Sequence, residues 1–218
     1  MNWTDAIVLA KKEGRSEWRQ RSVFGALLLY AVLTVFLIYF SFRHVDPSLW
    51  AGLLWLALLF GSVDALSKGF LQEGRERHFY YYTLIDPIAF LVAKLLYNSV
   101  LMLVLSCFTL LLFTLFLGFP VMDIVAFCCV LIGGIICFTI LFTFMSVLAA
   151  RSGKSTTLVS ILTLPIAIPL LAIIIAATQK TMVQHTFMAY ANDLLFLAAL
   201  NILLLALAVI LFKFTWQD

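Results

Sequence analysis

The sequence predicts an all-α integral membrane protein with six membrane-spanning helices and both termini in the cytoplasm. Hydrophobic residues make up 64% of the 218 residues and charged residues only 11%, whereas a soluble domain carries about a quarter charged residues. The apolar residues fall into six long runs, and positive charge gathers on one side of them. Because these runs fill nearly all of residues 23–214, we expect any ATPase or catalytic domain to sit on another chain.

Each of the six apolar runs is long enough to cross a membrane as a helix, which takes about 20 residues. The expected spans are about 23–42, 49–67, 88–117, 121–149, 157–178 and 194–213. Residues 68–87 form the largest polar connection, on the cytoplasmic side. Residues 1–22 form a cytoplasmic segment whose apolar spacing suits either an amphipathic helix on the membrane surface or an ordinary basic anchor.

The positions of lysine and arginine predict the orientation, because positive charge near the membrane stays on the cytoplasmic side during insertion. With six spans and the N-terminus inside, only Arg43 and Lys180 of the 14 Lys and Arg residues fall on the outer side. An odd number of spans would misplace some of the basic clusters. The distribution therefore predicts that both termini are cytoplasmic.

Three charged residues lie within or beside the apolar runs. Asp64 is expected within one turn of the inner surface, with Lys68 four residues on as its partner, so an ion pair is favoured over a proton or cation site. Lys94 lies seven residues into its run. The chain could follow the interface from Pro87 and turn inward near Lys94, whose amine would extend to the headgroups.

The fifth run carries Pro165 and Pro169, one helical turn apart, which free two backbone carbonyls and weaken the helix. Membrane helices tolerate proline, so a static kink and a moving hinge both stay open. The preceding loop begins at Arg151 and reads RSGKSTT. It lacks the glycine that a phosphate-binding loop requires at position 148, so we expect a short basic loop and no nucleotide site.

No constellation for catalysis or metal binding is visible in the sequence. The cysteines all fall inside apolar runs, and we expect them to be small packing residues. They are Cys107, Cys128, Cys129 and Cys137. The three histidines, at positions 44, 78 and 185, are too scattered to suggest a haem or metal site. Gly133 and Gly134 are expected to allow close helix packing, and the net charge of +3 does not suggest nucleic acid.

Several segments carry a family resemblance. They are LWLALLFGSVDAL at 54–66 followed by KGFLQEGRER, the Ala93-Lys94 pair after Pro87, and the stretch from Arg151 through Gly153 to LPIAIPLL at 164–171. The last stretch is the most specific. With a length near 220 and six expected spans, the chain resembles the CcmB family, which supplies the permease of the haem exporter used in cytochrome c maturation. The resemblance covers most of the chain.

The resemblance implies an ABC-2-type permease-like fold in the bacterial cytoplasmic (inner) membrane. It implies a subunit without ATPase activity, present in two copies with two CcmA-like ATPase subunits. CcmC-like and CcmD-like subunits would handle haem, and a CcmE-like chaperone would be released outside with haem. Haem would be a transported or handled ligand, with no stably bound cofactor.

Coupling to the ATPase is expected in the cytoplasmic loop 68–87, or in the N-terminal segment beside it. The candidate coupling residues are Glu73, Arg75, Glu76 and Arg77. A merely solvated loop is the alternative. Other functions also stay open: an ABC permease for a lipid or drug, or a membrane scaffold that transports nothing. A secondary transporter is disfavoured because the charges cluster near the inner face.

Overall fold

The computed structural model describes residues 21–42, 45–71, 87–151, 156–183 and 187–217. These residues form six α-helices. They are α2 (Arg21–Ser41), α3 (Pro47–Leu71), α5 (Pro87–Leu117), α6 (Ile124–Arg151), α7 (Thr156–Val183) and α8 (Phe187–Gln217). Each helix contains most of one of the six apolar runs. The expected N-terminal segment and the loop between α3 and α5 lie almost entirely outside the described residues.

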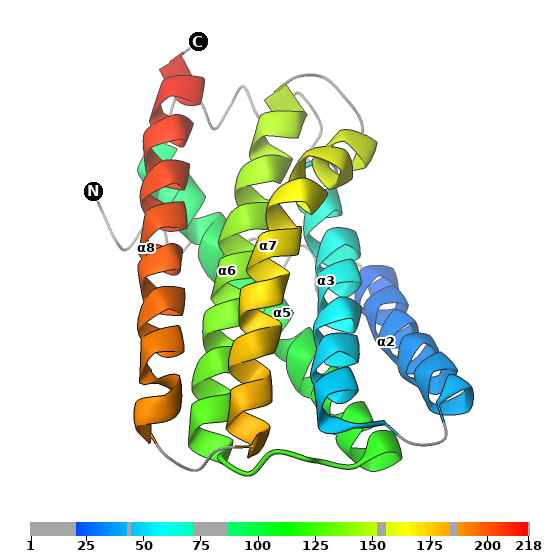
Figure 1. Ribbon diagram of the computed structural model, residues 1–218. Coiled ribbons are helices and arrows are strands. Elements are labelled where there is room, and N and C mark those ends of the chain that lie inside the picture. Colours follow the sequence, from blue (N-terminus) through cyan, green and yellow to red (C-terminus); the bar gives the residue numbers. More distant parts are fainter. Residues whose placement is uncertain (1–20, 43–44, 72–86, 152–155, 184–186, 218) are drawn as a thin grey trace.

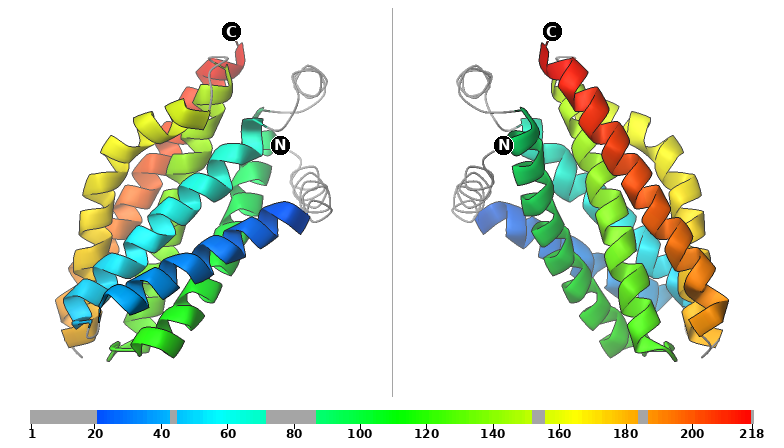
Figure 2. Two further views of the ribbon diagram at one scale, coloured as in Figure 1. Left: turned by 90° about the vertical axis from the view of Figure 1, so that its right-hand side faces the viewer. Right: turned by 90° about the vertical axis from the view of Figure 1, so that its left-hand side faces the viewer.

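The six helices run alternately in opposite directions, so that successive helix ends meet at the same end of the bundle (Figure 1). Helix α6 occupies the centre and packs against α3, α5, α7 and α8. Within its most apolar segment, 61% of the residues are buried, compared with 11% in α8 at the edge. Helix α2 packs on α3 and α5 and is tilted further from the long axis of the bundle than the other helices (Figure 2).

The core is built around large aromatic side chains. The fully buried ones are Trp50, Trp55, Phe113, Phe127, Phe138 and Phe142. Glycines on α6 make room for them and for α8. A Cβ atom at Gly134 would lie 2.8 Å from Cζ3 of Trp55, and one at Gly133 would lie 2.7 Å from Cδ2 of Leu197. The expectation that these two glycines serve close packing is confirmed, since each one admits a different neighbouring helix.

The outer sides of the bundle are apolar. Leucine, isoleucine and phenylalanine side chains on α2 and α8 are widely exposed, including Leu37, Phe40 and Leu195 at about 70%. Within the described residues, four helices are long and apolar enough to cross a membrane, and α2 and α3 contribute shorter apolar stretches at 25–41 and 47–63. Because so large an apolar surface is unstable in water, the chain is a multi-pass membrane protein.

The cysteines differ from the expectation. Cys137 is buried in the core, whereas Cys107, Cys128 and Cys129 are exposed on the outer faces of α5 and α6. The expectation of packing residues is therefore wrong for three of the four cysteines. In a membrane helix the faces toward lipid and toward protein are both apolar, so an apolar run does not reveal which face is buried.

Candidate functional site

Lys94 is buried inside the bundle, with only 2% of its surface exposed. It lies in α5, which continues without interruption from Pro87 to Leu117. The expectation that the chain turns inward near Lys94 and that its amine reaches the headgroups is therefore wrong. The 31 residues of α5 are about 46 Å long at 1.5 Å per residue, and an unbroken helix of this length fits a thinner bilayer when it tilts.

A buried amide lies one turn further along the same face of α5. The Nδ2 atom of Asn98 donates a hydrogen bond of 2.7 Å to the Oγ1 atom of Thr143 on α6. Ser146, also on α6, donates to the carbonyl of Thr143 at 2.7 Å. Because Lys94 and Asn98 are four residues apart, they share one helix face. Polar groups are costly inside a membrane, so this buried strip of Lys94, Asn98 and Thr143 is a candidate functional site.

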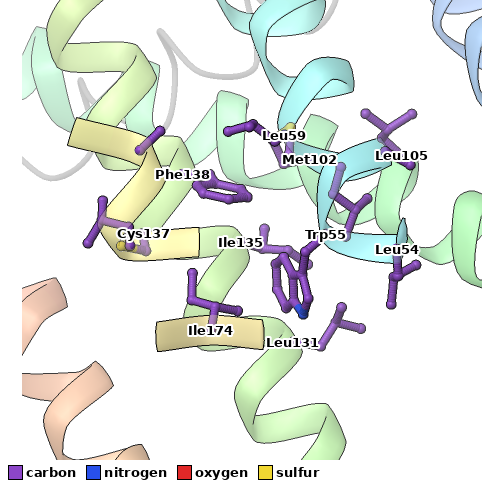
Figure 3. Packing of buried hydrophobic residues seen from close by; sticks show 14 of the residues in the cluster. Leu54, Trp55, Leu59, Met102, Leu105, Leu131, Ile135, Cys137, Phe138 and Ile174 are labelled. Carbon is purple, nitrogen blue, oxygen red and sulfur yellow. The ribbon is translucent and has the colours of Figure 1, made fainter. Parts of the chain in front are cut away.

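A second polar contact joins α3 to α7. The Nε1 atom of Trp55 donates to the Oγ1 atom of Thr178 at 2.8 Å, and the same hydroxyl donates to the carbonyl of Ile174 at 2.8 Å. The indole also packs against Phe138 of α6, with ring centroids 5.9 Å apart. Figure 3 shows it among side chains of α6 and α7, including Ile135 and Ile174. Trp55 therefore connects three helices at one point.

Helix α7 contains both predicted hinge candidates, Pro165 and Pro169. Their side chains lie on the exposed face of the helix, while Ala167 and Leu170 face the core. Figure 1 shows the first turns of α7 inclined relative to the rest of the helix. A bend is expected where prolines remove hydrogen bonds from the i to i−4 pattern. The structure thus contains the kink, and motion about it stays a prediction.

The remaining predicted site residues lie at the edge of the described chain or beyond it. Asp64 and Lys68 are in α3, and Arg151 is the last residue of α6. Their side chains are outside the described part, so the expected ion pair between Asp64 and Lys68 stays a prediction. The coupling candidates Glu73, Arg75, Glu76 and Arg77 and the histidines at 44, 78 and 185 are also outside it. Among the described residues, no group of His, Cys, Asp or Glu could hold a metal ion.

Sequence reasoning missed two asparagines inside apolar runs. Asn98 forms the contact to Thr143 described above. Asn201 on α8 donates from Nδ2 to the carbonyl of Gly133 on α6 at 3.0 Å, and its Oδ1 atom is buried without a hydrogen-bond partner in the described part of the chain. The available signal was a single amide within LLYNSV and AALNIL, since a lone polar residue in a membrane helix usually faces protein.

Comparison with known proteins adds two findings. A family model described as "CcmB protein" matches residues 4–215, a range that enters all six helices. Among individual curated proteins, none matches the chain.

Proposed function

The chain belongs to the CcmB protein family, and from this premise we propose that it is the membrane permease subunit of an ABC-type transporter in cytochrome c biogenesis. In this role it couples a partner ATPase to haem export or to release of a haem-loaded chaperone. The observation that carries the proposal is the extent of the family match, which reaches from residue 4 to residue 215 and so leaves almost nothing of the bundle outside it.

In the proposed topology all six helices cross the bacterial inner membrane, with both termini in the cytoplasm. The alternating helix directions in Figure 1 support an even number of crossings. Helices α2 and α3 are the shortest, at 21 and 25 residues, and their lengths of about 31 and 37 Å still exceed a hydrocarbon core of about 30 Å. In this topology Lys180 lies at the outer end and is one of only two basic residues assigned to that side.

The proposed contact with the ATPase is the cytoplasmic loop 68–87. A bundle whose sides face lipid offers only its two ends to a soluble partner, and the end of α3 and the start of α5 bracket this loop at the end assigned to the cytoplasm. Its charged residues Glu73, Arg75, Glu76 and Arg77 provide ion-pair partners. Two copies of the chain would bind two CcmA-like ATPases, beside CcmC-like and CcmD-like subunits and a CcmE-like chaperone. Haem is then a handled ligand and not a resident cofactor.

The test is extraction of the tagged full chain in mild detergent, followed by identification of the proteins that copurify. Recovery of an ATPase together with cytochrome c maturation subunits supports the proposal. An ATPase alone favours a permease for a lipid or drug, and assembly proteins without an ATPase favour a scaffold. Recovery of neither contradicts the proposal.

The same preparation tests the coupling loop. The double variant E73A/E76A is expected to lower ATPase recovery by about two- to thirtyfold, because each exposed ion pair contributes about 0.2–1 kcal/mol. The control is H44A, a substitution between α2 and α3 on the side assigned to the outside, and it is expected to leave recovery unchanged. Equal recovery of the ATPase with all variants excludes Glu73 and Glu76 as contacts with the ATPase. Arg75 and Arg77 are then the remaining candidate contacts in this loop.

A further inference from the structure

Four consecutive residues near the C-terminal end of α7 form hydrogen bonds or an ion pair with neighbouring elements. Thr178 accepts the hydrogen bond of 2.8 Å from Trp55 of α3. The next residue, Gln179, donates from Nε2 to the carbonyl of Ser48, also on α3, at 3.1 Å. Two successive residues of α7 thus contact two points on α3, one in the core and one at its N-terminal end.

The two residues that follow bind other elements. The Nζ atom of Lys180 forms an ion pair of 2.7 Å with Oδ2 of Asp193 on α8. The carbonyl of Thr181 accepts a hydrogen bond of 3.2 Å from the backbone N–H of Asp123. Asp123 in turn caps α6, because its Oδ1 atom accepts the backbone N–H of Ala126 at 3.0 Å. Successive helix residues point about 100° apart, so residues 178–181 hold α7 from several sides.

The N-terminal part of α7 lies beyond two prolines. Pro165 and Pro169 remove two hydrogen bonds from successive turns, leaving the carbonyls of Ile161 and Pro165 without their usual helical donors. Both prolines lie on the exposed face, so the core does not hold their rings. The small side chain of Ala167 lies between them on the buried face. Thr163 is buried on the same face as Ala167, so a change of bend here repacks this buried face and leaves the proline rings outside the core.

We propose that α7 acts as a lever in which residues 174–183 stay fixed and residues 156–169 swing about the two prolines. Trp55 is the positioning residue that holds the fixed part, through its bond to Thr178 and its ring contact with α6. The division into a fixed and a movable part is a property of the chain alone. That ATP drives the swing rests on the proposed function, because the movable part lies at the end assigned to the cytoplasm.

The division is tested by amide hydrogen exchange on the full chain in lipid nanodiscs. Exchange in residues 161–171 is expected to be about tenfold or more faster than in 174–183, because opening costs less where hydrogen bonds are missing. W55F and T178V are expected to accelerate exchange in 174–183 about three- to tenfold, the range for one lost hydrogen bond, with little change in 161–171. P165A/P169A is expected to slow exchange in 161–171 alone.

The matched control is W50F. Trp50 donates a similar bond of 3.1 Å, but to the carbonyl of Gly118, so this variant should leave exchange in α7 unchanged. Equal exchange along α7, or a response of 174–183 to W50F as large as to W55F, overturns the lever. Each comparison between variants concerns the same segment of α7, so the protection of its amides by lipid is the same on both sides of the comparison.

The second arm adds the copurified ATPase and ATP. In the unaltered chain, the rate of amide exchange is expected to change only in residues 156–171. In the W55F variant, the change is expected to extend into residues 174–183. A response along the whole of α7, or only in 174–183, overturns the inference. If no ATPase binds, the proposed function is wrong, and the exchange pattern of the chain alone still decides whether α7 has a fixed and a movable part.

Discussion

Gly134 offers the sharpest test of the packing described here, through the substitution Gly134→Ala. The added methyl carbon would lie 2.8 Å from Cζ3 of Trp55 and 3.1 Å from Cγ2 of Ile174. The indole is rigid and is held by its hydrogen bond to Thr178, so it cannot move aside as a flexible side chain would. The backbones of α3, α6 and α7 must separate instead.

The size of the effect follows from two opposing contributions. Overpacking a well-filled core costs about 1–3 kcal/mol. Replacing glycine by alanine within a helix stabilises the folded state by about 0.5–1 kcal/mol, because alanine loses less backbone entropy on folding. The net loss of unfolding free energy is therefore about 0–2.5 kcal/mol, and at about 2–4 °C per kcal/mol for a chain of this size the midpoint of thermal unfolding falls by up to about 10 °C.

The assay is thermal unfolding in mild detergent, followed by intrinsic tryptophan fluorescence. The matched control is Gly52→Ala, because a Cβ atom at Gly52 meets nothing within 4 Å, so this substitution should leave the midpoint unchanged or raise it. The double variant G134A/W55F is expected to lose less stability than the sum of its single variants, since the smaller ring makes room for the methyl group. A midpoint of G134A equal to that of G52A would refute the reasoning.

Three further predictions concern the polar contacts. In a background without the native cysteines, Lys180→Cys is expected to react with an impermeant maleimide from the outer side and Lys94→Cys is not, because 44% of the Lys180 side chain is exposed and only 2% of Lys94; labelling of both would contradict the burial of Lys94. Thr143→Val removes the acceptor of the Asn98 amide and is expected to lower the unfolding free energy by about 0.6–1.5 kcal/mol. The double variant N98A/T143V should then cost less than the sum of the single changes, and strict additivity would exclude the bond. Asp193→Asn breaks the partly exposed ion pair and is expected to cost at most about 1 kcal/mol at low salt and almost nothing at high salt, so an equal cost at both ionic strengths would argue against it.

The positions of the helices follow from the sequence because length and hydropathy decide where a chain can enter lipid. Capping details shift the ends. Helix α6 begins at Ile124, after Asp123 caps its first turn and after Gly118 adopts a positive φ of 81°. Helix α8 begins at Phe187, ahead of the apolar run that starts near residue 194, and it continues through Asn192 and Asp193 at the bundle end, where Asp193 pairs with Lys180.

Which face of each helix is buried could not be read from the sequence. In water, burial and hydropathy change together along a helix, and the apolar stripe marks the core. In lipid that link is lost, so the exposed Cys128 and the buried Cys137 lie in equally apolar surroundings. The polar contact between Trp55 and Thr178 was missed for a related reason, because the two residues are 123 positions apart and neither carries a charge.

The few polar and glycine contacts matter more here than they would in a soluble bundle. Lipid is as apolar as leucine, so burying an apolar face supplies little energy for choosing one helix neighbour over another. Each neighbour of the central α6 is held by a different contact. The hydrogen bond between Asn98 and Thr143 joins α5, and the hydrogen bond from Asn201 to Gly133 joins α8. The packing of Trp55 and Ile174 against Gly134 joins α3 and α7. Because these points are separate, the proposed swing of the N-terminal part of α7 would leave α5 and α8 in their places on α6. On this proposal, motion passes along a single helix while the contacts between the other helices stay intact.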